Sequence, residues 1–282
     1  MKFSVITINY NNCSGLIRTI NSIIGQTFRD FELIIIDGGS SDGSVEQIRK
    51  VEGQLAYWCS EPDRVVYNAM NKGVGKATGE YSIFMNSGDC FHSNDVLERF
   101  SRISCDVAAG YTDCVIWDSD NVAKEVKKQL TVPMEMTGKQ IIQFGINHQS
   151  VFIKTELLRI HPYDENLKFV SDYKLFIQVL VIEGSSYEAL PIIVADYDYS
   201  GMTSIESNRE EMNNERLRVL EELIPLRILT DYEDYINGHT ELQRIINKYC
   251  DTSTYFRILT MFAIVLDRIQ LTYLKLKRTF FS

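Results

Sequence analysis

The sequence of 282 residues predicts an α/β protein with a doubly wound, mostly parallel sheet and a helical C-terminal extension. Apolar strand-like runs alternate with segments of helical period in the N-terminal part, which is typical of this class. The run that begins at Phe31 is apolar in the way expected for a strand buried on both faces. From about Glu206 onward the sequence becomes charged and helical. We therefore predict one domain over residues 1–205 and a helical extension over residues 206–282.

The first strand is predicted from Phe3 to Ile8, a short run rich in β-formers. The polar side chains from Asn9 onward arrive too soon for the apolar core of a signal peptide. A helix follows, because apolar residues recur at helical spacing through Ile24.

The second strand lies in "FELIIIDGGSSDGS", residues 31–44, and precedes a glycine turn. Ser40 or Asp42 is the expected N-cap of a helix that runs through Ile48. A third helix is predicted over residues 67–77, and the strand of residues 81–85 follows it.

The middle of the chain is less regular. The run "DVAAGYTDCVIW", residues 106–117, indicates a pair of strands, and "HQSVFIK", residues 148–154, indicates one strand. The segment from Ser171 to Gly184 predicts a helix capped by Ser171 and ended by Gly184.

The last segment, Thr254 to Ser282, carries five basic residues and one acidic residue, a net charge of 5 − 1 = +4. Its longest uncharged run, Ile258 to Leu266, is far shorter than the ~20 apolar residues that span a membrane. Such a helix can lie on an anionic membrane surface, or pack on the body or on a second subunit as in a homodimer. The sequence leaves these alternatives open.

Charge and cysteine content narrow the function classes. A net charge of −9 argues against a nucleic-acid-binding protein, which gains affinity by neutralising phosphates. The six cysteines show neither zinc-type pairs nor the clustering of a secreted disulfide scaffold. We therefore expect free thiols in a reducing cytoplasm.

Polar side chains are predicted at the carboxyl ends of three strands: Asn9, Asp37 and Asp89. Ligands of open α/β sheets bind outside these ends. If the ligand is a nucleoside diphosphate, Asp89 with Asn86 nearby suits Mg²⁺ or Mn²⁺, which takes one or two protein carboxylates and offsets charge on a leaving diphosphate. A simple Asx-type turn is the structural alternative.

Two further candidates have ordinary explanations as well. Asp172 follows Ser171 at a helix start, where the helix dipole favours a negative charge whether or not the residue does chemistry. His148 could be a hydrogen-bonded core histidine.

The combination of motifs resembles the family 2 glycosyltransferases, especially the branch that builds bacterial surface polysaccharides. The matching text is "SVITINYNN", "ELIIIDGGSSDGS", "SEPDRVVYNAMNKGVGKATGEYSIFMNSGD", "HQSVFIK" and "SDYKLF". The resemblance covers roughly residues 2–204. It implies the glycosyltransferase A fold, which is a single nucleotide-binding αβα sandwich, and an inverting, metal-dependent enzyme.

The resemblance also implies roles for individual residues. Asp89 would bind the Mn²⁺ or Mg²⁺ ion, and Asp172 would be the base that deprotonates the acceptor hydroxyl. His148 and Gln149 would lie near the acceptor or the diphosphate. The nucleotide-sugar donor would contact Thr7, Asn9, Tyr10, Asp37, Asp63, Arg64 and Asn86.

The implied reaction transfers a sugar from a UDP-sugar to a hydroxyl of a lipid-linked saccharide, at the cytoplasmic membrane face, in capsule, O-antigen or exopolysaccharide synthesis. One alternative is a catalytically weak subunit that binds sugar nucleotides, which Asn68 and Asn86 would allow but Asp89 and Asp172 oppose. Another is a nucleotidyltransferase, and the absence of Lys and Arg from "NYNNCSG" after the first strand counts against it.

Overall fold

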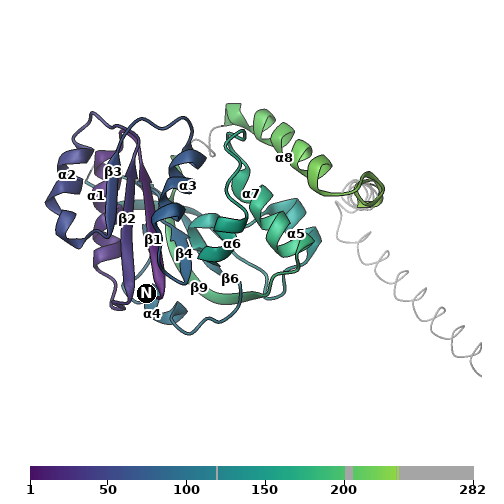
Figure 1. Cartoon of the computed structure of the whole chain (residues 1–282), viewed down its shortest axis with the longest axis horizontal. Coiled ribbons are helices and arrows are strands. Elements are labelled where there is room, and N and C mark those ends of the chain that lie inside the picture. The colour runs from purple at the N-terminus through teal and green to yellow at the C-terminus, as the bar shows by residue number, and fades with distance from the viewer. Residues whose placement is uncertain (119, 201–205, 233, 235–282) are drawn as a thin grey trace, which may run out of the picture. The chain divides into compact units, whose positions relative to one another are not determined.

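A computed structural model describes residues 1–118, 120–200, 206–232 and 234. It confirms the α/β class, and Figure 1 shows the sheet with helices packed around it. The strands are β1 (Phe3–Asn9), β2 (Phe31–Asp37), β3 (Tyr57–Ser60), β4 (Tyr81–Phe84), β5 (Cys90–Phe91), β6 (Val107–Trp117), β7 (Ala123–Leu130), β8 (Val151–Lys154) and β9 (Tyr187–Asp198). The α-helices are α1 (Cys13–Ile24), α2 (Ser44–Lys50), α3 (Val66–Lys76), α4 (Val96–Phe100), α5 (Gly138–Phe144), α6 (Thr155–Ile160), α7 (Ser171–Phe176) and α8 (Arg209–Leu223). Shorter helical segments are η1 (Glu52–Gln54), η2 (His148–Ser150), η3 (Ile177–Ile182) and η5 (Glu206–Asn208).

The strands form one mixed sheet in the order β3-β2-β1-β4-β8-β6-β9-β5, and β7 pairs with β6. The four N-terminal strands are parallel. Asn9 lies opposite Asp37, which lies opposite Ser60. The register therefore brings the polar carboxyl ends of β1, β2 and β3 together, as the sequence predicts.

Helices cover both faces of the parallel half. Val5 belongs to a buried cluster that includes Leu16 and Ile20 of α1. Its neighbour Ile6 faces α3, where a Cβ on Gly73 would lie 2.5 Å from Ile6 Cγ2. Because side chains alternate along a strand, α1 and α3 lie on opposite faces. This explains why every residue of β1 is buried, including the polar residues Ser4 and Thr7.

The prediction of a strand pair over residues 106–117 is wrong, because this segment is the single long strand β6. Gly110 sits inside this strand, where β9 approaches closely. A Cβ at Gly110 would lie 2.5 Å from Val194 Cγ2 and 2.8 Å from the Ile192 carbonyl oxygen. Glycine here allows close packing of two strands.

The predictions for residues 148–154 and 171–184 hold in part. The first segment begins with the 3-10 turn η2 and becomes strand β8 only at Val151. The second begins as α7 and continues as a π-helix, η3. Ser171 is the first residue of α7 and not its cap, since its Oγ accepts a hydrogen bond from the Asp164 backbone N–H at 2.6 Å.

The first compact unit of the chain runs from Met1 to Leu223 and includes α8. The buried carboxylate of Glu215 on α8 accepts hydrogen bonds from the backbone N–H groups of Lys168 and Phe169, both at 2.9 Å. The boundary at 205/206 stays a prediction. The basic segment from Thr254 to Ser282 lies outside the described residues.

Among the described residues, no helix is long and apolar enough to cross a membrane. The cysteines in this part of the chain, Cys13, Cys59, Cys90, Cys105 and Cys114, are all free.

Candidate active site

Asp37 organises the carboxyl ends of β1, β2 and β3. It is fully buried, and its carboxylate accepts five hydrogen bonds. The donors are Asn9 Nδ2, Ser40 Oγ, Ser60 Oγ and the backbone N–H groups of Gly39 and Ser40. Burial alone would raise the pKa of Asp37, but these bonds outweigh it and lower the pKa. Asp37 is therefore an ionised anchor for the loop that follows β2.

Tyr10 and Asp63 flank this loop at Gly38. A Cβ placed on Gly38 would lie 3.1 Å from the Tyr10 ring and 3.5 Å from Asp63 Oδ2. Tyr10 is 68% exposed, so its ring is free to stack, and Asp63 accepts a hydrogen bond from Lys72 Nζ at 2.6 Å. An exposed aromatic ring beside a carboxyl group suits a nucleoside. Arg64 is exposed next to Asp63, and within the described residues no hydrogen bond or ion pair joins it to the other predicted site residues.

The turn from Asn86 to Asp89 is held by α1. Arg18 Nε and Nη2 both donate to the Gly88 carbonyl oxygen, at 3.0 and 2.7 Å. Thr19 Oγ1 donates to the Asp89 carbonyl oxygen at 2.6 Å and accepts from the Gly88 N–H at 3.1 Å. Gly88 has φ +109°, a region that L side chains rarely adopt. Glycine is therefore required for this turn.

Asp89 lies at the end of this turn and is only 4% exposed. Burial raises its pKa to about 7, against the opposing effects of an N–H bond from Asp198, the nearby His148 and a side-chain hydrogen bond with Gln149. The Asp198 N–H donates to Asp89 Oδ1 at 2.9 Å, and the Asp198 carboxylate pairs with Arg18 Nη2 at 3.0 Å.

Asp172 joins the same region through His148. Asp172 Oδ2 lies 3.1 Å from His148 Nδ1, and His148 Nε2 lies 3.1 Å from Asn86 Nδ2. If the imidazole carries its proton on Nδ1, it donates to Asp172 and accepts from the Asn86 amide. A chain of polar contacts thus connects the turn after β4 with the start of α7. Both side chains are partly accessible, 18% for His148 and 21% for Asp172.

Buried polar atoms without partners gather at the predicted site. Nine buried side-chain N or O atoms of the described residues lack a hydrogen bond. Four of them belong to predicted site residues: Thr7 Oγ1, Asn9 Oδ1, Asn86 Oδ1 and Gln149 Oε1. Because buried polar groups are normally paired, such a group of acceptor oxygens indicates a place for a ligand. With the Asp89 carboxylate, the oxygens of Asn86 and Gln149 are hard donors that fit Mg²⁺ or Mn²⁺.

The structure therefore places the predicted residues in two groups. One surrounds the Asp37 loop, and the other surrounds the turn after β4. The groups are adjacent, because the Ser87 N–H donates to the Ile8 carbonyl oxygen, next to Asn9. In the described part of the chain, Arg64 makes no hydrogen bond or ion pair with either group.

Sequence reasoning missed Arg18, Thr19 and Asp198. Arg18 is the one charged residue of the first helix, which was a usable signal for Arg18 and its neighbour Thr19. Asp198 gave none, because it lies about a hundred residues from Asp89 and meets it only through the pairing of β5 with β9.

Comparison with known proteins gives a consistent result. The model of glycosyl transferase family 2 matches residues 4–158, more than half of the chain. An uncharacterized glycosyltransferase of Mycobacterium tuberculosis strain H37Rv is 29% identical over 210 residues, which cover 71% of this chain and 76% of the relative. A PGL/p-HBAD biosynthesis glycosyltransferase of the same strain is 24% identical over 213 residues, which cover 74% of this chain and 81% of the relative.

Among solved structures, S. aureus TarS superimposes with a TM-score of 0.56 at 19% identity. The match covers 70% of this chain but 37% of TarS. A TarS fragment of residues 1–349 gives a TM-score of 0.55 at 19% identity, over 70% of this chain and 60% of the fragment. This chain thus spans less than two thirds of these structures, and the likeness concerns the fold. The family match, which covers more than half of the chain, shows that the chain belongs to glycosyl transferase family 2 and is a glycosyltransferase of that type.

Proposed function

We propose that the protein is an inverting, metal-dependent glycosyltransferase that uses a UDP-sugar. The observation that carries this proposal is the set of buried acceptor oxygens without partners on Thr7, Asn9, Asn86 and Gln149. Structures of the TarS fragment with UDP and with UDP-GlcNAc make a uridine nucleotide the first donor to test.

The nucleoside would lie over the Asp37 loop. Tyr10 would stack on the base, and Asn9 and Asp63 would bind base or ribose groups. Asp37 itself would act mainly through the loop, because five donors of the chain already occupy its carboxylate. Arg64, exposed on the neighbouring loop, would reach the nucleotide only on donor binding.

A divalent ion, when bound, would offset the negative charge that develops on the leaving diphosphate. Asp89 would hold it, with the side-chain oxygen of Asn86 and that of Gln149 close by. Arg18 and Thr19 would keep the turn in the shape that presents these groups.

Asp172 would take the proton from the attacking acceptor hydroxyl as general base. Its Oδ1 accepts a hydrogen bond from the Tyr173 N–H at 2.9 Å, and its Oδ2 faces His148. These two contacts fix the orientation of the carboxylate. Attack on the anomeric carbon from the face opposite the diphosphate would invert the configuration.

We propose a lipid-linked saccharide as acceptor and surface polysaccharide synthesis as the process. Residues 1–205 would form the catalytic domain. Residues 206–282 would form a helical extension that contacts the cytoplasmic membrane face or a second copy of the chain. The acidic charge of the chain, −9, agrees with a small phosphate ligand rather than a nucleic acid.

The first test is calorimetric binding of UDP, GDP and dTDP to the full-length protein, each with Mn²⁺ and with a chelator. We expect UDP to bind with Mn²⁺ only, and Asp89→Ala to abolish this binding. If no nucleotide binds under any condition, the turn after β4 is only structural and the proposal fails.

The second test is Asp172→Asn, which keeps the size of the side chain and removes the base. Transfer should fall by about 10²-fold or more, while UDP affinity stays within about twofold. NMR of the product reports the anomeric configuration, and retention would contradict the inverting mechanism. An unchanged rate would favour a subunit that binds sugar nucleotides without catalysis.

A further inference from the structure

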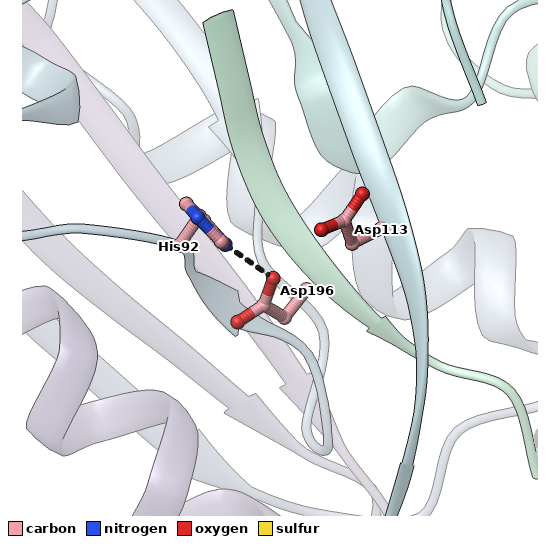
Figure 2. Close-up of side chains that lie close together, drawn as sticks. All are labelled: His92, Asp113 and Asp196. Atoms are coloured by element: carbon pink, nitrogen blue, oxygen red, sulfur yellow. Dashed lines mark hydrogen bonds and ion pairs between the residues drawn. The ribbon is translucent and has the colours of Figure 1, made fainter. Parts of the chain in front are cut away.

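A second group of metal-binding side chains lies outside the residues assigned above. It consists of His92, Asp113 and Asp196, each of which offers one ligand atom, and these atoms all lie within 4.8 Å of one another. Figure 2 shows the three side chains, with the hydrogen bond between His92 and Asp196 dashed. His92 Nδ1 lies 2.7 Å from Asp196 Oδ1.

Strand pairing brings these side chains together. Asp113 on β6 lies directly opposite Asp196 on β9 in a parallel pair. Cys90 of β5 lies opposite Asp196 in an antiparallel pair, and His92 is two residues further along. Because residues two apart face the same side of a strand, His92 lies on the side of Asp196. The sheet, and not a loose loop, therefore fixes the geometry of the cluster.

The two carboxylates are poorly compensated. Asp113 is 8% exposed, and the Asp196 side chain is 17% exposed. Like charges directly opposite each other in a sheet are destabilising, and a buried charge without a partner is costly. Gln129 Nε2 donates to Asp113 Oδ1 at 2.8 Å, but no lysine or arginine of the described residues pairs with either carboxylate. The described part of the chain therefore gives the cluster no permanent positive charge.

We propose that His92, Asp113 and Asp196 bind a divalent transition-metal ion, such as Zn²⁺ or Mn²⁺. Imidazole nitrogen suits Zn²⁺ and related ions, and carboxylate oxygens suit Mn²⁺. One nitrogen and two oxygen donors leave coordination positions for water, which reaches the cluster beside His92, whose side chain is 39% exposed. The ion offsets both carboxylates at once.

The position on β9 gives this ion a structural role. Asp196 precedes Asp198 by two residues, and the Asp198 N–H donates to Asp89 Oδ1. A metal held by residues of β6, β9 and the segment after β5 fixes these three segments to one another. It thereby steadies the strand end that orients Asp89. The ligands differ from those of the proposed catalytic ion, so each site can be removed separately.

The test is calorimetric titration of Zn²⁺ and of Mn²⁺, without nucleotide, into chelator-treated full-length protein. The variants are His92→Ala, Asp113→Asn and Asp89→Ala. His161→Ala is the matched control, because His161 Nε2 contacts Glu183 at 2.7 Å and no third ligand residue joins them among the described residues. We expect one metal site to persist in Asp89→Ala and His161→Ala and to weaken at least tenfold in His92→Ala and Asp113→Asn.

A second measurement covers the case in which a variant folds poorly. The visible absorption of Co²⁺ bound to the Asp89→Ala protein should indicate nitrogen ligation. This absorption should be absent from the double variant that carries both Asp89→Ala and His92→Ala. Equal metal binding with and without His92 would overturn the proposal, as would the absence of any metal site in Asp89→Ala. His92→Ala protein should still bind UDP in the presence of Mn²⁺, because the proposed transferase function needs Asp89 and not His92. A failure of the second metal site can therefore be distinguished from a failure of the proposed transferase function.

Discussion

At the scale of single residues, Asp89 places a titratable carboxyl group in a buried position. Its carboxyl group is almost fully buried, and burial raises its pKa to about 7. The unfolded chain releases this proton near pH 3.8. Between these values the native state binds the proton more tightly than the unfolded chain does, so the free energy of unfolding falls as pH rises. An acid in this position is costly without a cation.

We therefore predict that metal-free wild-type protein loses stability from about pH 4 to about pH 7, while Asp89→Asn does not. The difference should reach the order of a few kcal/mol at pH 8 and vanish near pH 4. Denaturant unfolding in chelator at several pH values measures it. Asp120→Asn, at an exposed position, is the control and should follow wild type. Parallel curves for wild type and Asp89→Asn would contradict the assignment.

In the proposed mechanism, His148 does not touch the acceptor. It orients the carboxylate of Asp172, the proposed base. His148→Ala frees Asp172 Oδ2 and leaves the Asn86 amide without its partner. We predict a loss of about 10- to 100-fold in kcat with a smaller change in KM. His148→Asn, which retains a donor near Asp172, should recover part of the loss. Steady-state kinetics of the two variants measure kcat and KM separately. An effect confined to KM would mean that His148 only binds substrate.

At the scale of elements, α1 serves the site as much as the core. Leu16, Ile20 and Ile23 are buried against the sheet, while Arg18 and Thr19 bind the turn after β4. The Arg18 guanidinium also lies 4.1 Å from the centre of the Trp117 ring. One short helix therefore links the turn, the end of β9 and the end of β6.

Arg18→Lys should disturb this arrangement, because lysine cannot reproduce the forked contacts with Gly88 and Asp198. We predict a loss of about 1–3 kcal/mol in unfolding free energy and weaker Mn²⁺-dependent UDP binding. Arg29→Lys is the matched control, since exposed Arg29 makes one bond to the Ile24 carbonyl oxygen. Thermal unfolding and calorimetry give the two readouts. Similar effects of both substitutions would argue against a special role for Arg18.

The elements also show where sequence prediction succeeds. The strands β1, β2 and β4 and the helices α1 and α3 were predicted nearly to their ends, because periodicity and turn residues agree there. Strand β6 was not predicted correctly. A glycine such as Gly110 can mark either a turn or a close approach of two strands, and only the neighbouring strand β9 shows that the second applies here. For the site, the strand-end carboxylates were readable, and the contacts of Arg18 and Asp198 with the turn were not.

At the scale of the whole molecule, α8 belongs to the first compact unit and braces the segment before Asp172. Glu215 binds the N–H groups of Lys168 and Phe169, while Val219 and Leu220 are buried at 1% and 8% exposure. Each buried side chain of this size contributes about 1.5–3 kcal/mol. We therefore expect the body that carries the candidate site to depend on residues beyond 205, the boundary predicted from composition.

We predict that a chain ending at Leu223 folds cooperatively and binds UDP with Mn²⁺, whereas a chain ending at residue 205 is markedly less stable. Circular dichroism during heating and calorimetry provide the comparison. Glu215→Gln in the full chain is the control that weakens only the hydrogen bonds to Lys168 and Phe169. It should lose less stability than the chain that ends at residue 205. Equal stability of the two shortened chains would place the functional boundary at 205, as the composition suggests.

The sequence alone determined the α/β class, the parallel half of the sheet and the polar strand ends. These depend on local patterns, which are periodicity, turn residues and the position of acids after apolar runs. Only the tertiary structure decided that Arg18 holds the turn of Asp89, that His148 connects Asn86 with Asp172, and that His92, Asp113 and Asp196 converge. Such contacts join residues far apart in the chain, and their geometry follows from strand order and register, which local patterns do not encode.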